Sequence, residues 1–159
     1  MELQTELNFK LSQIFSEVME KFAFMFTDPT TKEDLSDKVN NFSSDIIMAE
    51  MNFKGNIKGT LSIALPIYMA LEIGINALGI EADQDAEKSC AQDALKELIN
   101  VLCGQVVILL AGREPVFDLS IPETHIITKN KWTELLKDKL SIPFIVEEYP
   151  VLFKLEILS

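Results

Sequence analysis

The segment from about residue 85 to residue 111 constrains the fold most, because its apolar residues recur at helical spacing over several turns. They cover one broad face, and a face of that width must pack against a core. The residues on this face are Leu95, Leu98, Ile99, Leu102, Val106 and Leu109. The sequence therefore predicts one long amphipathic helix with a defined outer side.

The outer side of this helix carries a polar stripe made of Asp93, Glu97, Asn100 and Gly104. These residues follow the i, i+4, i+7, i+11 spacing that places side chains along one face of a helix. Exposed polar faces of this kind are most often simply solvated, so the spacing alone does not establish a site.

Two members of the polar stripe favour a functional interpretation. Asparagine is a modest helix former, yet Asn100 lies inside an apolar stretch where lysine or glutamate would serve solvation better. Gly104 costs about 1 kcal/mol relative to alanine in a helix interior. A glycine below Asn100 would let another surface approach the helix closely. We therefore interpret the stripe as a docking and water-orienting surface.

The rest of the chain mixes helices with strands joined by hairpins. The strands expected are Ile46–Phe53, Ile57–Leu65, Val116–Thr128, Ile142–Glu147 and Val151–Leu158. Lys54-Gly55-Asn56 is a hairpin signal between the first two strands, and the last two are expected to turn at Tyr149-Pro150.

The helices expected besides the long one are residues 3–26, 66–78 and 129–140. Asp28-Pro29 ends the first, because the residue before a proline is pushed away from helical angles, and Gly79 stops the second. Asp83 or Asp85 could cap the long helix, which Gly112 and Pro115 end. Thr30–Ser43 is polar and is expected to be a loop with a short helical turn. The sequence thus predicts a single α+β domain over residues 1–159, with an antiparallel-rich sheet and long helices packed on it.

Composition excludes several classes of function. The formal net charge of −11 disfavours nucleic acid and anionic membrane surfaces as partners. The N-terminus has no signal-peptide pattern, and no uninterrupted apolar run reaches the roughly 18–20 residues that span a bilayer. Cys90 and Cys103 are expected about 20 Å apart on one helix, too far to pair. We expect a reduced, cytoplasmic protein that does not insert into membranes.

The segment from Asp93 to Gly104 resembles the signature helix of the CheC/CheX chemotaxis phosphatases. It reads Asp-Ala-Leu-Lys-Glu-Leu-Ile-Asn-Val-Leu-Cys-Gly, which contains the Asp/Ser-x3-Glu-x2-Asn pattern and a glycine four residues after the Asn. Pro122 matches the distal proline of that signature, one residue off its usual spacing. The resemblance covers residues 46–122, including the first hairpin, and is closest to the CheX branch.

The resemblance implies a function and roles for residues. The helix would dock against the aspartyl-phosphate pocket of a CheY-like response regulator, where Asn100 orients the attacking water and Glu97 pairs with a lysine of the regulator. Asp93 and Gly104 would belong to the same partner-binding surface. The metal, Mg²⁺, would belong to the regulator, so no cofactor or metal site is expected in this chain.

A repeated residue spacing within the chain fits the same family. Ser16, Glu20 and Ala23 on the first helix repeat the spacing of Asp93, Glu97 and Asn100. The resemblance implies a pseudo-two-fold relation between the two helices, with the first inactive because Ala23 has no amide. It also implies a homodimer, formed through strand or sheet contacts.

Other interpretations of the sequence remain open at this point. The chain could be a non-catalytic CheX-like dimeric binding module that docks a signalling partner, or a purely structural dimer. Cys103 and His125 could form a nucleophile pair. Glu81, Asp83 and Asp85 resemble a cation-binding cluster only loosely, and an acidic helix entrance accounts for them better.

Overall fold

The computed structural model describes residues 2–40, 45–81, 87–113 and 116–158. Its helices are α1 (Glu2–Ala23), α2 (Lys32–Asn40), α3 (Ile67–Leu78), α4 (Glu87–Ala111) and α5 (Lys129–Lys137). Its strands are β1 (Thr27–Pro29), β2 (Ile46–Lys54), β3 (Lys58–Pro66), β4 (Asp118–Leu119), β5 (Glu123–Ile127), β6 (Ser141–Val146) and β7 (Tyr149–Leu158).

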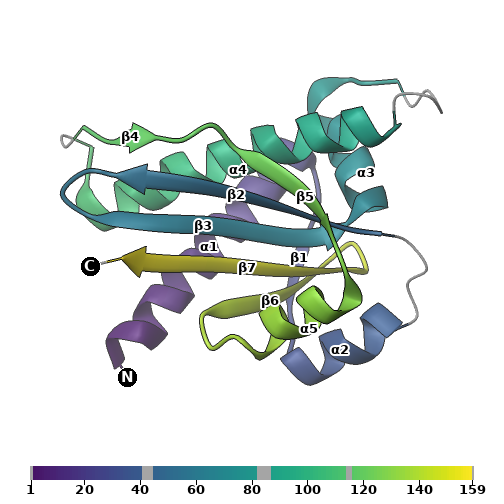
Figure 1. The fold of residues 1–159 in the computed structure, drawn as a ribbon, viewed down its shortest axis with the longest axis horizontal. Helices are drawn as coiled ribbons and strands as arrows, with labels where there is room; N and C mark the ends of the chain where they lie inside the picture. Colours follow the sequence, from purple (N-terminus) through teal and green to yellow (C-terminus); the bar gives the residue numbers. More distant parts are fainter. Residues whose placement is uncertain (1, 41–44, 82–86, 114–115, 159) are drawn as a thin grey trace.

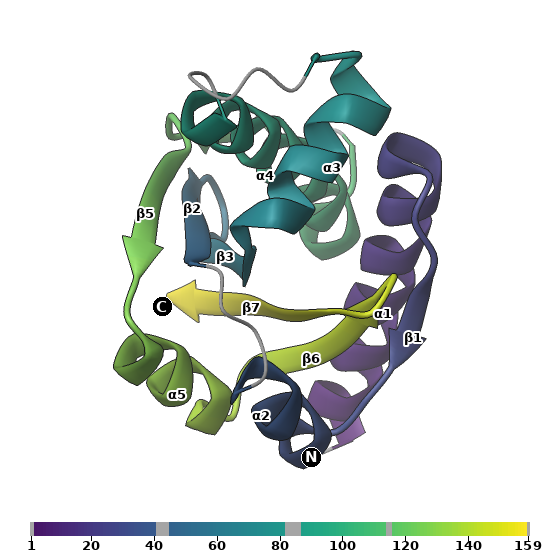
Figure 2. The same ribbon diagram turned by 90° about the vertical axis from the view of Figure 1, so that its right-hand side faces the viewer.

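The strands form one seven-stranded antiparallel sheet in the order β1-β6-β7-β3-β2-β4, and β5 also pairs with β2. The hairpin of β2 and β3 lies at the centre, with a register from Ile46 opposite Pro66 to Lys54 opposite Lys58. Helices α1, α3 and α4 lie on one face of the sheet, and α2 and α5 lie on the other (Figures 1 and 2). The predicted α+β architecture with an antiparallel sheet is confirmed.

The main core lies between the sheet and the helices α1, α3 and α4. Alternate residues of β2, from Ile47 to Phe53, point into it, as the period of two along a strand requires. Phe15 of α1 stacks on Phe144 of β6 with ring centroids 4.3 Å apart. This core fixes α4 against the sheet along its whole apolar face.

A second, smaller core lies between the other face of the sheet and the helices α2 and α5. Trp132, Leu135 and Leu136 of α5 are buried in it, as the sequence predicted. The sequence predicted a loop with a short helical turn at Thr30–Ser43, but Lys32–Asn40 form a helix of 9 residues, α2, and residues 41–43 lie outside the described part of the chain. Leu35 is fully buried in the second core, and the Thr31 hydroxyl accepts a hydrogen bond from the Asp34 N–H. The N-cap and the buried Leu35 stabilise this helix, but its nine residues contain too few apolar positions for a clear helical period in the sequence.

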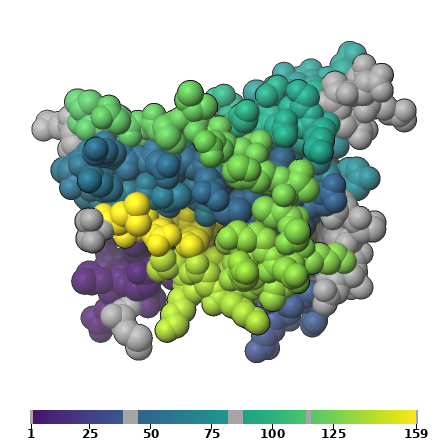
Figure 3. All heavy atoms as spheres, in the orientation of Figure 1, coloured from purple at the N-terminus to yellow at the C-terminus, as the bar shows by residue number. Residues whose placement is uncertain are grey.

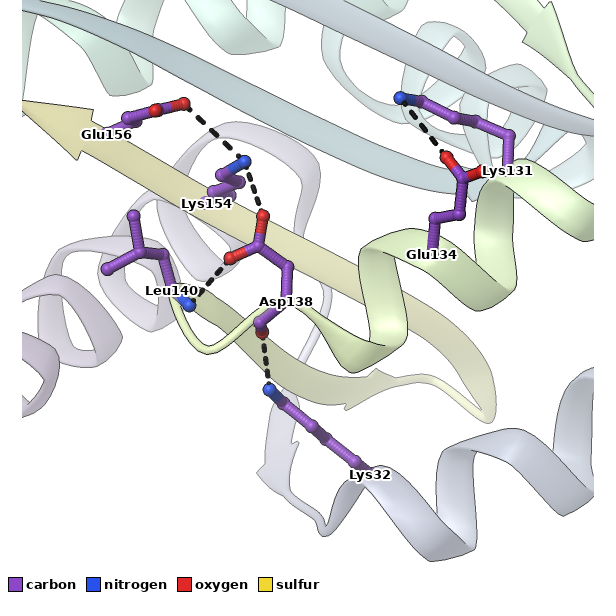
Figure 4. A network of polar contacts seen from close by, with 7 residues as sticks. All are labelled: Lys32, Lys131, Glu134, Asp138, Leu140, Lys154 and Glu156. Atoms are coloured by element: carbon purple, nitrogen blue, oxygen red, sulfur yellow. Dashed lines mark hydrogen bonds and ion pairs between the residues drawn. The ribbon is translucent and has the colours of Figure 1, made fainter.

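A polar cluster connects these two helices to the sheet (Figure 4). The Asp138 carboxylate, directly after α5, accepts hydrogen bonds from Lys154 Nζ of β7 at 2.6 Å and from the Leu140 N–H at 2.9 Å. Lys32 Nζ of α2 donates to the Asp138 carbonyl at 2.6 Å. The hydrogen bonds from Lys154 and Leu140 hold the pKa of Asp138 below its ordinary value.

The rest of that sheet face is not covered by α2 or α5, so strand residues form the surface there (Figure 3). Its residues include the polar Asn52, Thr60 and Glu156. Asn52 of β2 and Thr60 of β3 lie opposite each other on it, and the Thr60 hydroxyl donates to Asn52 Oδ1 at 2.8 Å. Helices therefore protect only the apolar half of this face.

Two predicted chain reversals are placed differently in the structure. Helix α1 ends at Ala23 rather than near residue 26, because Phe24 adopts a positive φ of 56° and turns the chain so that Met25 enters the core. The final hairpin turns at Glu147 and Glu148, with φ of 46° and 74°, and not at Tyr149-Pro150, which begin β7. Two central residues with positive φ suit a tight two-residue hairpin, but glutamate gives no sequence signal for it. Strand β1, which pairs with β6, was not expected.

Helix α4 is, among the described helices, the one long and apolar enough to cross a membrane by length and composition alone. The helix concerned is Lys88–Ala111, which contains an 18-residue window with a mean hydropathy of 1.8. In the structure its apolar face packs in the main core, where Leu95, Leu98, Ile99 and Leu102 have no exposed surface. Packing within the domain therefore accounts for the apolar residues on the inner face of α4, whereas Ile108 near its end is 37% exposed.

Candidate functional site

The polar stripe lies on the outer side of α4, as its spacing predicted. Asp93, Glu97 and Asn100 are exposed, whereas their neighbours Leu98 and Ile99 are fully buried. Helix α4 ends where Gly112 takes a positive φ of 80° and donates its N–H to the Ile108 carbonyl. The expected capping residues Asp83 and Asp85, and Pro115, lie outside the described residues.

Three members of the stripe line a shallow groove of about 410 Å³. Its walls come from the end of α3, from α4 and from the connection between β4 and β5. The lining residues are Leu78, Asp93, Lys96, Glu97, Asn100 and Pro122. The structure thus brings Pro122 to the stripe, although it is 22 residues from Asn100 in sequence.

Three polar residues of the groove, Asp93, Glu97 and Asn100, are available to bind another molecule as far as the described residues are concerned. Within the described part of the chain, the structure gives no hydrogen-bond or ion-pair partner to Asp93, Glu97 or Asn100. An exposed carboxylate and an exposed carboxamide, three residues apart on a helix, lie on neighbouring turns of one face. The carboxylate of such a pair can bind a cation, and the carboxamide can both donate a hydrogen bond to a water and accept one from it.

Gly104 is not one of the groove residues but continues the stripe beyond Asn100. A Cβ atom placed on Gly104 would meet no atom within 4 Å, apart from its chain neighbours and the backbone of its own helix turn. Packing inside the domain therefore does not require a glycine here. Its absence of a side chain instead leaves the backbone of α4 open to a surface from outside.

The first helix does not form a second groove of the same kind. Glu20 is exposed, but Ala23 is fully buried, and its carbonyl accepts a hydrogen bond from Asn76 Nδ2 at 2.9 Å. Ser16 lines a different, largely apolar hollow between α1, β1 and β6. Ser16, Glu20 and Ala23 therefore do not share one surface.

The structure excludes the pairing of Cys103 with His125. Cys103 lies in the main core, where burial raises the pKa of its thiol to about 11. His125 of β5 lies opposite Met48, which points to the other face of the sheet, and its Nε2 is 3.9 Å from Glu123. In the segments described here, no three His, Cys, Asp or Glu side chains come together as a metal-binding group. Asp83 and Asp85, two of the three acidic residues considered as a cation-binding cluster, lie outside these segments.

Sequence reasoning missed two residues of the groove, Leu78 and Lys96. Lys96 precedes Glu97 and could have been placed at the flank of the stripe from helical periodicity alone. Leu78 comes from another helix, and only the packing of α3 on α4 brings it to the groove. The signal for it was weak: an apolar residue directly before the Gly79 stop, which has a positive φ of 65°.

Comparison with known proteins gives the same assignment as the helix pattern. The family described as "Chemotaxis phosphatase CheX" matches residues 47–145, which include all of β2 except its first residue and the whole of α4. The chain belongs to the CheX family. A comparison with curated proteins gives no match.

Solved structures of CheX proteins share the fold of this chain. Chemotaxis protein CheX from Desulfovibrio desulfuricans is 15% identical with a TM-score of 0.66, and the match covers 96% of this chain and 99% of that one. CheX in the CheX–CheY–BeF3–Mg²⁺ complex from Borrelia burgdorferi is 17% identical with a TM-score of 0.61, covering 94% and 96%. CheX from Vibrio vulnificus is 20% identical with a TM-score of 0.60, covering 92% and 93%. At these identities the likeness concerns the fold, which extends over nearly the whole domain.

Proposed function

We propose that this CheX-family chain accelerates the loss of phosphate from the aspartyl phosphate of a CheY-like response regulator, in chemotaxis or a related two-component pathway in the cytoplasm. Membership of a chemotaxis phosphatase family supports the proposal, as does the fold shared with a CheX solved in complex with CheY. The observation that carries it is the groove on α4, where Glu97 and Asn100 are exposed and unpartnered among the described residues.

The reaction needs little covalent chemistry from the protein. A water attacks the phosphorus in line, a new P–O bond forms, and the bond to the aspartate oxygen breaks, which releases inorganic phosphate and the free carboxylate. Holding that water in place removes orientational freedom that the step would otherwise have to lose. In our proposal the Asn100 carboxamide holds the water, because it can accept from one water hydrogen and donate to a phosphoryl oxygen.

The other stripe residues would bind the regulator. Glu97, one turn before Asn100, pairs with a lysine of the regulator and so fixes the position of the helix. Gly104 lets the regulator approach the α4 backbone, and Asp93 contributes to the same surface. The Mg²⁺ needed for charge neutralisation is bound by the regulator, and this chain supplies no cofactor of its own.

We also propose that the chain forms a homodimer through the β4–β5 edge of the sheet. Apolar side chains are exposed along this edge, with Val116 at 87%, Ile121 at 84% and Leu119 at 43%. An edge strand presents unpaired backbone groups, and a second copy would satisfy them while covering these side chains. The two grooves would remain separate, with one active edge in each subunit.

The proposed function is tested by an assay on receiver domains from the same genome. Each receiver is phosphorylated with acetyl phosphate, the donor is removed, and loss of the acyl phosphate is followed with and without the full chain. We expect at least one receiver to lose phosphate faster than its intrinsic rate. Binding of a phosphorylated receiver without any acceleration would instead identify a non-catalytic binding module.

A further inference from the structure

We propose that Leu78 of α3 is a recognition residue of the same groove, and that the target regulator presents an apolar side chain beside its phosphorylated aspartate. This inference rests on the proposed function and adds a second helix to the docking surface. It starts from an exposed leucine, 42% of whose surface is accessible, among polar groove residues.

The position of Leu78 follows from the packing of α3 on α4. A Cβ atom on Gly74 would lie 3.3 Å from Ala94 Cβ and 3.8 Å from the Cys90 carbonyl oxygen, so Gly74 faces α4 at close range. Residues four apart lie on the same side of a helix. Leu78 therefore also faces α4, one turn further along, beside Asp93, the neighbour of Ala94.

The end of α3 is closed in a way that keeps Leu78 in place. Gly79 has a φ of 65°, and its N–H donates to the Gly74 carbonyl, which also accepts from the Ile80 N–H at 3.3 Å. A left-handed residue at this position stops the helix directly after Leu78. The leucine is therefore held at the rim of the groove by a defined helix end.

Core packing among the described residues gives no reason for an apolar residue at position 78. Its side chain is not among the apolar groups that pack against either core. On the opposite side of the groove lies Pro122, which is also apolar. The groove thus has a polar floor on α4, formed by Asp93, Lys96, Glu97 and Asn100, between the apolar residues Leu78 and Pro122. A partner that contacts the floor would lie against both apolar residues.

The occupant that fits this arrangement is one surface with mixed chemistry. Its cation would meet Glu97, its phosphorylated site would meet Asn100, and its apolar side chain would cover Leu78. Because burial of an apolar side chain increases affinity without acting on the reacting atoms, Leu78 should affect binding and selectivity rather than the chemical step.

Ile75 provides a matched control on the same helix. It is also aliphatic and is 44% exposed, but it follows Gly74 by one residue and so faces away from α4 by about 100°. Ile75 does not line the groove. The variants Leu78→Gln and Ile75→Gln change the same kind of surface by the same amount, and glutamine keeps good helix propensity.

The experiment uses the full chain and the receiver domain that it dephosphorylates fastest. Initial rates at increasing concentrations of phosphorylated receiver give the half-saturating concentration and the maximal rate, and the same receiver loaded with beryllofluoride and Mg²⁺ gives a dissociation constant. For Leu78→Gln we expect both concentrations to rise about tenfold, with an unchanged maximal rate. Ile75→Gln should change the half-saturating concentration and the dissociation constant by less than twofold each. Leu78→Met should keep the wild-type values of both constants and of the maximal rate.

Three results would overturn the inference, and each is distinct from failure of the proposed function. Leu78→Gln could bind as well as wild type, could weaken binding no more than Ile75→Gln, or could lower the maximal rate alone. In all three cases loss of activity in Asn100→Ala would show that the proposed function stands. If the wild-type chain accelerates no receiver, the proposed function fails and the role of Leu78 fails with it. Thermal unfolding of each variant shows that the comparison is made on folded protein.

Discussion

Lys154 of β7 lies 2.6 Å from the Asp138 carboxylate at the end of α5, and this ion pair joins the second layer of helices to the sheet. Both side chains are largely sheltered, with 19% of Lys154 and 30% of Asp138 exposed. The Leu140 N–H donates to the same carboxylate. The contact therefore holds α5 over the second core, far from the groove on α4.

Replacing Asp138 by asparagine should destabilise the domain in a pH-dependent way. The Lys154 hydrogen bond keeps the pKa of Asp138 below its ordinary value. The stability that this hydrogen bond adds is fully present above the pKa of Asp138 in the unfolded chain, about 3.9. It is lost as the pH falls through the lower pKa of Asp138 in the folded protein. At pH 7 we expect Asp138→Asn to lower the free energy of unfolding by about 1–3 kcal/mol, and by less below pH 3, as measured with denaturant.

Glu134→Gln is the control for this prediction. Glu134 forms an exposed pair with Lys131 at 3.9 Å, and such surface pairs contribute little. Its effect should stay below about 0.5 kcal/mol at every pH. A difference between wild type and Asp138→Asn that does not shrink on acidification would contradict the assignment.

Asn100→Ala should abolish most of the phosphatase activity without affecting the fold. The side chain is exposed and has no partner among the described residues, so the free energy of unfolding should change by less than about 0.5 kcal/mol. Loss of the water-orienting amide should lower the maximal rate of acyl-phosphate loss by about 100-fold or more. Asn100→Gln, which keeps the amide but moves it, should also be slow. Wild-type rates in Asn100→Ala would place the site elsewhere.

Glu97→Gln should act on binding. The neutral amide cannot pair with a cation, so the half-saturating receiver concentration should rise while the maximal rate changes little. The dependence of binding on salt should also weaken relative to wild type, because one charge pair is lost. Dissociation constants at low and high ionic strength measure this. The prediction fails if Glu97→Gln shows the same salt dependence as the unmodified chain.

Adding a side chain at Gly104 should have opposite effects on the stability of the domain and on docking of the receiver. Because a Cβ atom there meets open space, Gly104→Ala should stabilise α4 by about 0.5–1 kcal/mol. Gly104→Leu should remain folded but raise the half-saturating receiver concentration, since the larger side chain blocks close approach. Denaturant unfolding and receiver titration of both variants check the two effects. If Gly104→Leu docks normally, the regulator does not approach this turn.

The parts of the fold that were predictable have strong local patterns. The hairpin of β2 and β3 has two largely apolar, buried strands around a glycine turn, and α4 has an apolar face several turns long. Helix α2 and the turn at Glu147 and Glu148 were not predictable, because tertiary contacts determine them. Leu35 is held by the second core, and Glu147 is held by Phe26, whose N–H donates to Glu147 Oε1 at 3.0 Å.

The residues of the candidate site were also predictable only where a local pattern identifies them. Asp93, Glu97, Asn100 and Gly104 lie on one helix, so helical periodicity was enough to place them on one face. Leu78 and Pro122 come from other elements. Pro122 was found through a family pattern, but Leu78 required knowledge of how α3 packs on α4, which one sequence does not contain.

The separation of α4 into a buried face and an exposed face has a consequence for how this protein can evolve. Asp93, Glu97 and Asn100, which would recognise a regulator, are exposed and have no hydrogen-bond or ion-pair partner among the described residues, whereas Leu98 beside them is fully buried. Substitutions on the outer face can therefore change which regulator is served at almost no cost in stability. A duplicated copy of this chain could acquire a new signalling partner through a few surface changes, while the same core continues to fold.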